Sequence, residues 1–478
     1  PVRLEVQGSL DKSLQKYLLN ELELKERNLF ICESPLAMGF AYGMIDAIPS
    51  EISAPLLNSP FKPQPSIMVD PRKRVMDQVK EKDLFLSYPY ESMEPMIRLL
   101  REAAEDPEVV SIKITIYRLA NHSQIAEQLA YAAENGKEVT ALMELKARFD
   151  EENNIEWSTY LEEAGCKILY GFGEYKVHSK ICLITKYTDR GYEYITQVAT
   201  GNYNEKTAKL YTDFCMMTTH EGIAKDAVKF FNNMAIGELQ GEYEHIMVSP
   251  YSMNIGLEKL MDEEIQKVKQ GRRGLIRLKL NSISDRKTME KLSEASQAGV
   301  EIKMIVRGIC CLLPHIKDRT ENISIMSIVG RYLEHHRIYC FGEDEVAKIY
   351  ISSADFMTRN LRRRLEIACP IYDDDIKKEI IHIMNIMYAD NLKGRQINAE
   401  GFFEANIGDP EQKIESQKVL MLEAIEKAKK AEVLRKAEER DREKAPIYSH
   451  GKEKSSYESM SKEPKKGFIA FLKRLFKF

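Results

Sequence analysis

The stretch IKITIYRLANHSQIAEQLAYAAENGKEVTALMELKAR, residues 112–148, decides the fold class. Its two ends are apolar runs rich in Ile, Thr, Val and Leu, which favour β-strands, and the Ala- and Gln-rich segment between them favours a helix. A strand, a helix and a second strand in this order build one unit of a parallel sheet. The same alternation continues on both sides, so the sequence predicts an α/β fold.

A second set of segments resembles the first closely enough to indicate a duplication. IRLKLNS at 276–282 corresponds to IKITIYR at 112–118, and GVEIKMIVRGICC at 299–311 corresponds to GKEVTALMELKAR at 136–148. Similarity repeated along a chain is the mark of repeated structural units. We therefore expect two tandem α/β domains, with a strand ending before Arg118 in the first and before Arg307 in the second.

The two sets share a histidine motif. YKVHSKICLI at 175–184 places His178 two residues before Lys180, and YLEHHRIYCF at 332–341 places His335 two residues before Arg337. In an extended segment such residues point to the same face, so each imidazole would share a pocket with a cation that can hold a phosphate oxygen. A neutral imidazole can also carry a phosphoryl group. The motifs predict one composite phosphoryl-transfer site, with His178 as the stronger nucleophile.

Arginines follow three of the expected strands. Arg118, Arg148 and Arg307 would lie at the carboxyl edge of the sheets, where α/β proteins bind ligands. Phosphoryl transfer requires groups that position oxygens and neutralise their charge, and these arginines suit that task. The basic run at 359–364, RNLRRR, either grips an extended polyanion or forms an exposed loop paired with acidic residues.

Composition and charge set limits on the function. With 44% hydrophobic and 30% charged residues, the chain is typical of globular proteins, and no apolar run is long enough to span a bilayer. The net charge of −4 gives no general affinity for polyanions, so nucleic acid is not an expected partner. The N-terminus has no basic region followed by an apolar core, and we expect a cytoplasmic protein.

The two ends of the chain differ from the middle. We expect residues 1–64 to be the remnant of another domain, residues 65–245 and 246–395 to be the two catalytic domains, and residues 396–478 to be a charged helical tail. The last segment, Phe468–Phe478, has apolar and basic residues at helical spacing. This pattern is typical of a helix on the inner face of a membrane, and equally of one that docks on protein.

Several long segments carry a resemblance to a known family: YESMEPMIRLLREAAEDP (90–107), KARFDEENNIEW (146–157), TGNYNEKTAKLYTDF (200–214), SIVGRYLEHHRI (327–338) and YISSADFMTRNLRRRLEI (350–367). With VHSKICLI at 177–184, they resemble the large polyphosphate kinases, which belong to the phospholipase-D-like superfamily. The resemblance implies two tandem phospholipase-D-like domains. It also implies reversible transfer of the ATP terminal phosphate to inorganic polyphosphate, with Mg²⁺ as cofactor.

The resemblance also implies roles for individual residues. His178 would carry the phosphate as phosphohistidine, and Tyr211, Arg307 and His335 would hold the ATP phosphates. His335 would in addition assist proton movement at the leaving ADP. Arg118 and Arg148 match positions of the magnesium site; because arginine has no lone pair to offer a cation, we expect both to act through phosphate oxygens shared with Mg²⁺.

The chain departs from its relatives in two ways. Phospholipase-D-like hydrolases carry an Asp seven residues after the histidine, whereas this chain has Thr185 and Gly342, which disfavours diester hydrolysis. By this resemblance we expect the family's N-terminal domain to be missing and residues 1–64 to be the remnant of its head domain, through which the family forms dimers. Homo-oligomers are therefore expected only with a complete head domain. Two alternatives stay open: a phosphodiesterase or nuclease that passes the intermediate to water, and a polyphosphate-binding fragment without turnover.

Overall fold

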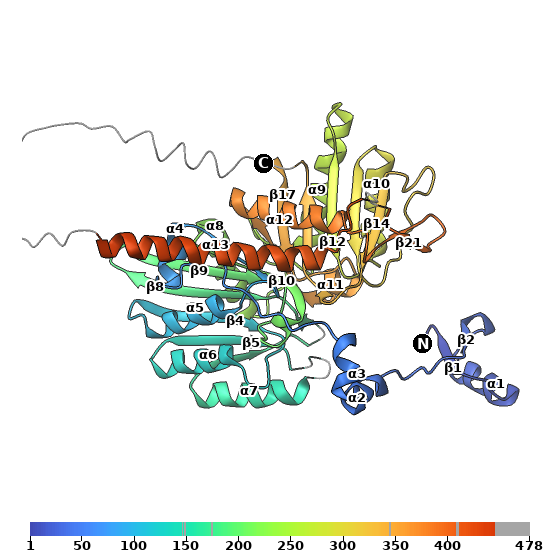
Figure 1. The fold of residues 1–478 in the computed structure, drawn as a ribbon, viewed down its shortest axis with the longest axis horizontal. Helices are drawn as coiled ribbons and strands as arrows, with labels where there is room; N and C mark the ends of the chain where they lie inside the picture. Colours follow the sequence, from blue (N-terminus) through green and yellow to red (C-terminus); the bar gives the residue numbers. More distant parts are fainter. Residues whose placement is uncertain (146, 148–149, 174, 344–345, 408–410, 445–478) are drawn as a thin grey trace, which may run out of the picture. The chain divides into compact units, whose positions relative to one another are not determined.

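The computed structural model describes residues 1–145, 147, 150–173, 175–343, 346–407 and 411–444. Arg148 and the segment Phe468–Phe478 therefore lie outside the described residues. The chain divides into two compact units, Pro1–Ala428 and Lys429–Phe478 (Figure 1). Both histidine motifs belong to the first unit.

The N-terminal segment of this unit is a small αβ element. Strand β1 (Leu4–Gln7) pairs in parallel with β2 (Leu29–Cys32), and the two are joined by α1 (Lys12–Glu21) and the 3₁₀ turn η1 (Glu26–Asn28). Asp11 caps α1, because its side chain accepts hydrogen bonds from the backbone N–H groups of Ser13 and Leu14. Three short helical segments follow: α2 (Phe40–Ala47), α3 (Ser50–Ser53) and η2 (Ala54–Leu56).

Apart from the short strand β15 (Leu333–Glu334), which comes from the second copy, the first large sheet is built from the earlier copy of the duplicated sequence. Its strands run in the order β15-β10-β9-β8-β4-β5-β6, and β3 pairs with β10. The strands expected at the two ends of the stretch 112–148 are confirmed as β4 and β5. The elements are α4 (Val75–Glu81), β3 (Leu84–Tyr88), α5 (Glu94–Glu105), β4 (Val109–Ile116), α6 (Gln124–Glu134), β5 (Glu138–Met143), α7 (Glu151–Glu163), β6 (Lys167–Tyr170), β7 (Lys176–Val177), β8 (Ile181–Thr188), β9 (Gly191–Ala199), η3 (Thr207–Lys209), β10 (Tyr211–Thr218) and α8 (Glu221–Ala235).

The second large sheet has nine strands in the order β11-β19-β17-β16-β12-β13-β14-β20-β21. Its central pairs β12–β13 and β13–β14 are parallel, as β4–β5 and β5–β6 are in the first sheet. The elements are β11 (Met247–Val248), α9 (Ser252–Lys269), β12 (Leu275–Leu280), α10 (Arg286–Gln297), β13 (Glu301–Val306), β14 (Ile323–Ile328), β15 (Leu333–Glu334), β16 (Arg337–Phe341), β17 (Lys348–Ser352), α11 (Thr358–Arg362), β18 (Arg364–Leu365), β19 (Ile367–Ile371), α12 (Asp374–Tyr388), β20 (Gly394–Ile397) and β21 (Phe403–Ala405).

A shared core joins the two copies. Helices α5, α6 and α7 lie together beneath the first sheet in Figure 1, and α8 contacts β8 and β9. One hydrophobic cluster then continues from Val198 and Phe214 of the first copy to Ile338 and Ile367 of the second. Because protein cores are packed as tightly as crystals, this continuity fixes the two copies as one body. The expected pair of tandem α/β domains is therefore confirmed.

Helix α13 (Ser416–Lys444) lies within the segment 396–478, for which a charged helix was expected. The last strand of the second sheet in chain order is β21. Among the helices of the described ranges, none is both long and apolar enough to cross a membrane.

Candidate active site

Each histidine motif is held by a short strand of the other copy. Strand β7, which precedes His178, pairs in parallel with β18, and the N–H groups of His178 and Ser179 donate to the carbonyl of Leu365 at 2.9 and 2.8 Å. Strand β15, which precedes His335, pairs in parallel with β10, and His336 N–H donates to the carbonyl of Thr212 at 2.7 Å. Neither motif is positioned by its own domain alone.

A carboxylate from the second copy orients His178. Nδ1 of His178 lies 2.8 Å from Oε2 of Glu366, which is fully buried. The hydroxyl of Ser353 donates to the same oxygen at 2.6 Å, and the amide of Asn360 donates to Oε1 at 2.5 Å. Because the acceptor holds the proton on Nδ1, the lone pair of Nε2 is left for attack on an electrophile.

The second histidine, His335, is likewise oriented by a carboxylate of the other copy. Nδ1 of His335 lies 2.9 Å from both carboxylate oxygens of Asp213, which belongs to the first copy. The hydroxyl of Thr200 donates to Asp213 at 2.7 Å, as Ser353 does to Glu366. Each half therefore supplies one imidazole and the carboxylate that orients the other.

Two buried cations accompany the imidazoles. Lys180 is 1% exposed, and its ammonium donates to the carbonyl of His178 and lies 5.3 Å from the ring centroid of Tyr117. Arg337 approaches Nε2 of His335 at 3.2 Å and forms a 2.9 Å ion pair with Asp355. The expectation that each cation lies beside its histidine holds, although Lys180 meets the backbone of His178 and not its ring.

The surroundings keep both imidazoles neutral near pH 7. Burial, reinforced by the positive charges of Lys180 and Arg364, lowers the pKa of His178 well below its ordinary value. Burial also lowers the pKa of His335, although Asp213 opposes that shift. The charge of Arg337 acts on both rings, so the two motifs share one electrostatic environment. Clusters of perturbed groups such as this one are typical of catalytic sites.

The other predicted residues gather around these histidines to different degrees. The ring of Tyr211 lies 5.3 Å from that of His335. Nε of Arg307 donates to the carbonyl of Glu334, the residue before His335, at 2.7 Å. Arg118 forms a 2.8 Å ion pair with Asp150 beside Tyr117, whose ring lies 4.7 Å from that of His178. Arg148 lies outside the described residues.

The basic run at 359–364 divides between the two interpretations that the sequence left open. Arg362 pairs with the buried Asp285 at 3.4 Å, and Arg364 lies 4.0 Å from Glu366. Arg359 and Arg363 are exposed. Part of the run is thus structural, and two of its guanidinium groups face solvent.

Sequence reasoning missed the two carboxylates that orient the histidines. Asp213 follows its hydroxyl partner Thr200 by 13 residues, and Glu366 follows Ser353 by the same number. This equal spacing in the two copies was the available signal. It is hard to notice because Asp213 lies within β10 and Glu366 lies between β18 and β19, and both have apolar neighbours, among which a charged residue is unusual.

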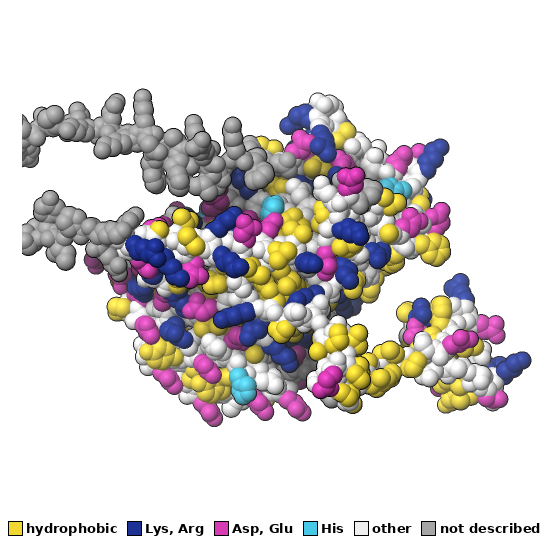
Figure 2. Space-filling view, viewed as in Figure 1, with side chains coloured by type: hydrophobic (Ala, Val, Ile, Leu, Met, Phe, Trp, Pro, Cys, Tyr) yellow, Lys and Arg dark blue, Asp and Glu magenta, His cyan; other side chains and the backbone are white. Residues whose placement is uncertain are grey.

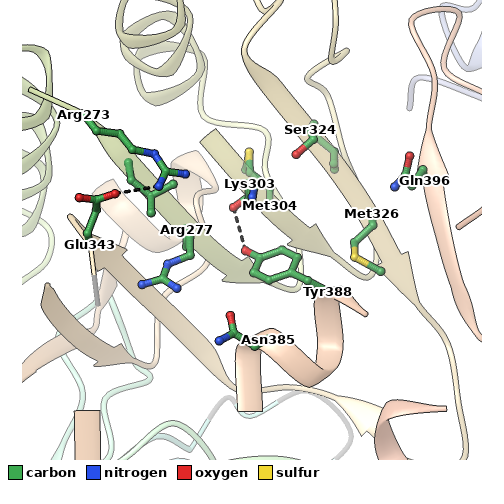
Figure 3. A pocket seen from close by; sticks show the side chains of 12 residues that line it. Arg273, Arg277, Lys303, Met304, Ser324, Met326, Glu343, Asn385, Tyr388 and Gln396 are labelled. Carbon is green, nitrogen blue, oxygen red and sulfur yellow. Dashed lines mark hydrogen bonds and ion pairs between the residues drawn. The ribbon is translucent and has the colours of Figure 1, made fainter. Parts of the chain in front are cut away.

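A cavity of about 450 Å³ opens elsewhere on the second sheet, and no predicted site residue lines it (Figure 3). Arg273 and Lys303 contribute positive charge to its wall. Arg273 pairs with Glu343 at 2.7 Å, and Lys303 pairs with Glu301 at 2.8 Å, so much of that charge is neutralised. The candidate active site is therefore identified by its paired imidazoles and not by this cavity.

The described residues contain no preformed metal site of three or more His, Cys, Asp or Glu ligands. Among them, no group of three or more His, Cys, Asp or Glu side chains lies close enough together to hold a metal ion. Arg118 is paired with Asp150 and cannot ligate a cation.

Comparisons with known proteins agree with this architecture. Residues 74–240 match the family model "Polyphosphate kinase C-terminal domain 1", and residues 246–417 match "Polyphosphate kinase C-terminal domain 2". The chain is 43% identical to the polyphosphate kinase of Staphylococcus epidermidis over 89% of its own length and 58% of that protein. It is 41% identical to the polyphosphate kinase of Bacillus cereus over 87% of its length and 59% of that protein.

A solved structure gives the same result. The crystal structure of polyphosphate kinase from Porphyromonas gingivalis superposes with a TM-score of 0.77 at 32% identity, covering 90% of this chain and 65% of that one. The chain thus spans less than two thirds of the length of these relatives. The two family models together cover well over half of the chain. The chain belongs to the polyphosphate kinase family, of which it carries both C-terminal domains.

Proposed function

We propose that this chain is the catalytic part of a polyphosphate kinase, which transfers the terminal phosphate of ATP reversibly to inorganic polyphosphate. The observation that carries the proposal is the crossed pairing of His178 with Glu366 and of His335 with Asp213. Two neutral imidazoles, each oriented by a carboxylate of the other copy, suit nucleophilic attack on phosphorus and stabilisation of the leaving group.

In this mechanism His178 is the nucleophile. Its Nε2 lone pair attacks the terminal phosphorus of ATP, the bond from that phosphorus to the bridging oxygen breaks, and ADP leaves. Glu366 accepts the Nδ1 proton in a hydrogen bond and stabilises the positive charge that grows on the ring. A terminal oxygen of polyphosphate then attacks the same phosphorus, the nitrogen–phosphorus bond breaks, and the polymer is one phosphate longer.

The second copy would hold the phosphates during both steps. His335, Arg307 and Tyr211 lie next to one another, and Arg337 approaches the ring of His335. Preorganised donors of this kind stabilise charge that develops in the transition state. Figure 2 shows that Lys and Arg are intermixed with Asp and Glu on the visible face of the protein. The polymer would therefore be bound by particular basic residues, and we propose the exposed Arg359 and Arg363 for this contact.

Magnesium would come with the nucleotide. Among the described residues, no group of three or more His, Cys, Asp or Glu side chains could hold Mg²⁺ without the substrate. Mg²⁺ is usually held by one or two carboxylates together with substrate phosphates and water. Arg118, and by resemblance Arg148, would therefore bind phosphate oxygens of the Mg²⁺–ATP complex.

Three further parts of the proposal concern the whole protein. The domain boundaries near residues 64, 245 and 395 stay proposals, as does homo-oligomer formation through a complete head domain. A cytoplasmic location is proposed, with the segment Phe468–Phe478 as the part that would touch the inner face of the membrane.

Labelling with terminally ³²P-labelled ATP and Mg²⁺ tests the function. The protein is expected to take up label that is stable to alkali and lost in acid, to pass it to polyphosphate, and to lose all labelling in H178A. The matched control is H122A, because His122 is exposed. Unchanged labelling in H178A would refute the role of His178. Polyphosphate binding without labelling would favour a binding module, and hydrolysis of a phosphodiester to a phosphomonoester and an alcohol would favour a phosphodiesterase.

A further inference from the structure

The first turn of α13 forms hydrogen bonds with the segment that precedes His335. The side chain of Gln417 is 2% exposed and forms hydrogen bonds with both the backbone N–H and the backbone carbonyl of Tyr332. Oε1 of Gln417 accepts from Tyr332 N–H at 2.9 Å, and Nε2 donates to the Tyr332 carbonyl at 2.9 Å. A single amide side chain thus pairs with the backbone as a neighbouring strand would.

The same amide also reaches the residue next to His335. Nε2 of Gln417 donates to Oε1 of Glu334 at 2.7 Å. The other carboxylate oxygen of Glu334 accepts from Thr212 Oγ1 at 3.2 Å and lies 3.6 Å from the ammonium of the buried Lys279. Glu334 is 2% exposed, and all of its partners come from other elements of the fold. The carboxylate is therefore held in one orientation.

The backbone of Glu334 continues this chain of contacts to the phosphate-binding groups. Its carbonyl accepts from Nε of Arg307 at 2.7 Å, and the next residue is His335. A displacement of Glu334 would therefore move Arg307 and His335, two of the three groups that we assign to the ATP phosphates. Sub-ångström placement of such groups governs the rate of transfer.

The start of α13 is itself anchored. Asp390 is fully buried, and its Oδ2 accepts from the N–H and the hydroxyl of Ser416 at 2.8 and 2.7 Å. Across from Gln417, a Cβ at Gly330 would lie 2.6 Å from Gln417 Oε1, so the glycine is needed for this close approach. The contact between Gln417 and Tyr332 therefore depends on the anchored start of α13 and on the glycine at position 330.

We propose that Gln417 is a positioning residue for phosphoryl transfer. Through Tyr332 and Glu334 it fixes the segment that carries His335, and it makes the first turn of the C-terminal helix part of the active-site scaffold. The inference rests on the proposed function for its kinetic readout, and it extends the site to a helix that contributes no residue to the chemistry.

The test compares Q417L with L420A in the otherwise intact chain. Leucine keeps the approximate size of glutamine and removes all three hydrogen bonds. Leu420 lies one turn further along α13, is 6% exposed and packs in the shared core, so L420A weakens the same helix while the three hydrogen bonds of Gln417 keep their donors and acceptors. Both variants are assayed well below their melting temperatures.

Q417L is expected to lose about 10-fold or more in kcat, whereas L420A stays within about 2-fold of wild type at a comparable loss of thermal stability. The double variant Q417E/E334Q exchanges the donor and acceptor of the buried contact and should recover part of the kcat that Q417E loses. Equal kcat values for Q417L and L420A would overturn the inference.

A second readout does not depend on activity. In ¹⁵N-histidine NMR spectra assigned with H335Q, the imidazole signals of His335 are expected to shift in Q417L and not in L420A, while those of the exposed His122 stay unchanged. If the wild-type chain transfers no phosphate, the proposed function fails, and this measurement still decides the role of Gln417. Unshifted His335 signals in Q417L would refute it.

Discussion

Oε2 of Glu366 lies 2.8 Å from Nδ1 of His178, although 188 residues separate the two in sequence. The contact joins one copy of the duplicated fold to the other, and the contact of His335 with Asp213 does so in the opposite direction. Neither copy alone contains an oriented imidazole. The duplication is therefore a requirement of the site, because each half completes the other.

Glu366 should be needed for the first transfer step. In E366Q the amide can present a donor to Nδ1, which favours the wrong tautomer of His178 and removes the charge that stabilises the imidazolium. We expect the single-turnover rate of protein labelling to fall by roughly 100-fold or more. E423Q is the control, since Glu423 pairs with the half-exposed His382 and not with the site. A rate in E366Q within a few-fold of wild type would contradict this role.

The pH profile of kcat/KM should be displaced to low pH. The pKa of His178 is lowered well below its ordinary value by burial, so the neutral nucleophile persists below pH 6.5 and the acid limb lies there. Burial also lowers the pKa of Lys180 to about 7, so its positive charge is lost as the pH rises through 7, and kcat/KM should fall. K180R should move only this alkaline limb to higher pH, because arginine stays charged. An alkaline limb that K180R leaves in place would contradict the assignment.

Gly201 should tolerate no side chain. A Cβ at this position would lie 2.1 Å from Oδ2 of Asp213, so G201A must displace the carboxylate from His335. We expect a loss of about 1–3 kcal/mol in the free energy of unfolding together with a lower kcat. G43A is the matched control, because nothing lies within 4 Å of the corresponding Cβ in helix α2. Differential scanning calorimetry and steady-state assays measure the two effects, and an unperturbed kcat in G201A would argue against a role for Asp213.

Asp355 should make stability depend on acid pH. Burial alone would raise its pKa, but the ion pair with Arg337 and the N–H groups of Asn281 and Ser282 outweigh burial and lower it from 3.8 to about 2. A folded-state pKa below the unfolded value stabilises the protein above pH 4, and this contribution is lost as the pH falls through 2. The contribution of Asp355 to the free energy of unfolding should amount to about 2 kcal/mol above pH 4, and it should be absent in D355N. Urea unfolding between pH 2 and 6 measures it, and parallel curves for the two proteins would contradict the prediction.

The duplicated α/β fold could be predicted because its strands and helices are locally encoded. β4, β5 and β6 are apolar runs of four to eight residues, and helix α6 between β4 and β5 has an apolar face. The strands β7, β15 and β18 have only two residues each, which no periodicity can indicate. They exist because the two copies pack together, and they are the strands that place the histidines.

The candidate site could be predicted only where its residues form a local pattern in the sequence. The repeated spacing of His178 with Lys180 and of His335 with Arg337 indicated the groups that we propose to react, since a duplicated motif is visible in one sequence. Glu366 could not be recognised as a partner of His178, because the pairing depends on the register of β18 against β7. The role of Gln417 depends in the same way on where α13 begins against the β14–β15 connection.

The central claim is that one phosphorus is held by both copies. A crystal structure of the protein with vanadate, a mimic of transferring phosphate, tests it most directly. The account predicts vanadium bonded to Nε2 of His178 of the first copy, with its oxygens contacted by His335 and Arg337 of the second. Vanadate bound by residues of one copy only, or a His178 ring whose Nε2 faces away from it, would contradict the claim.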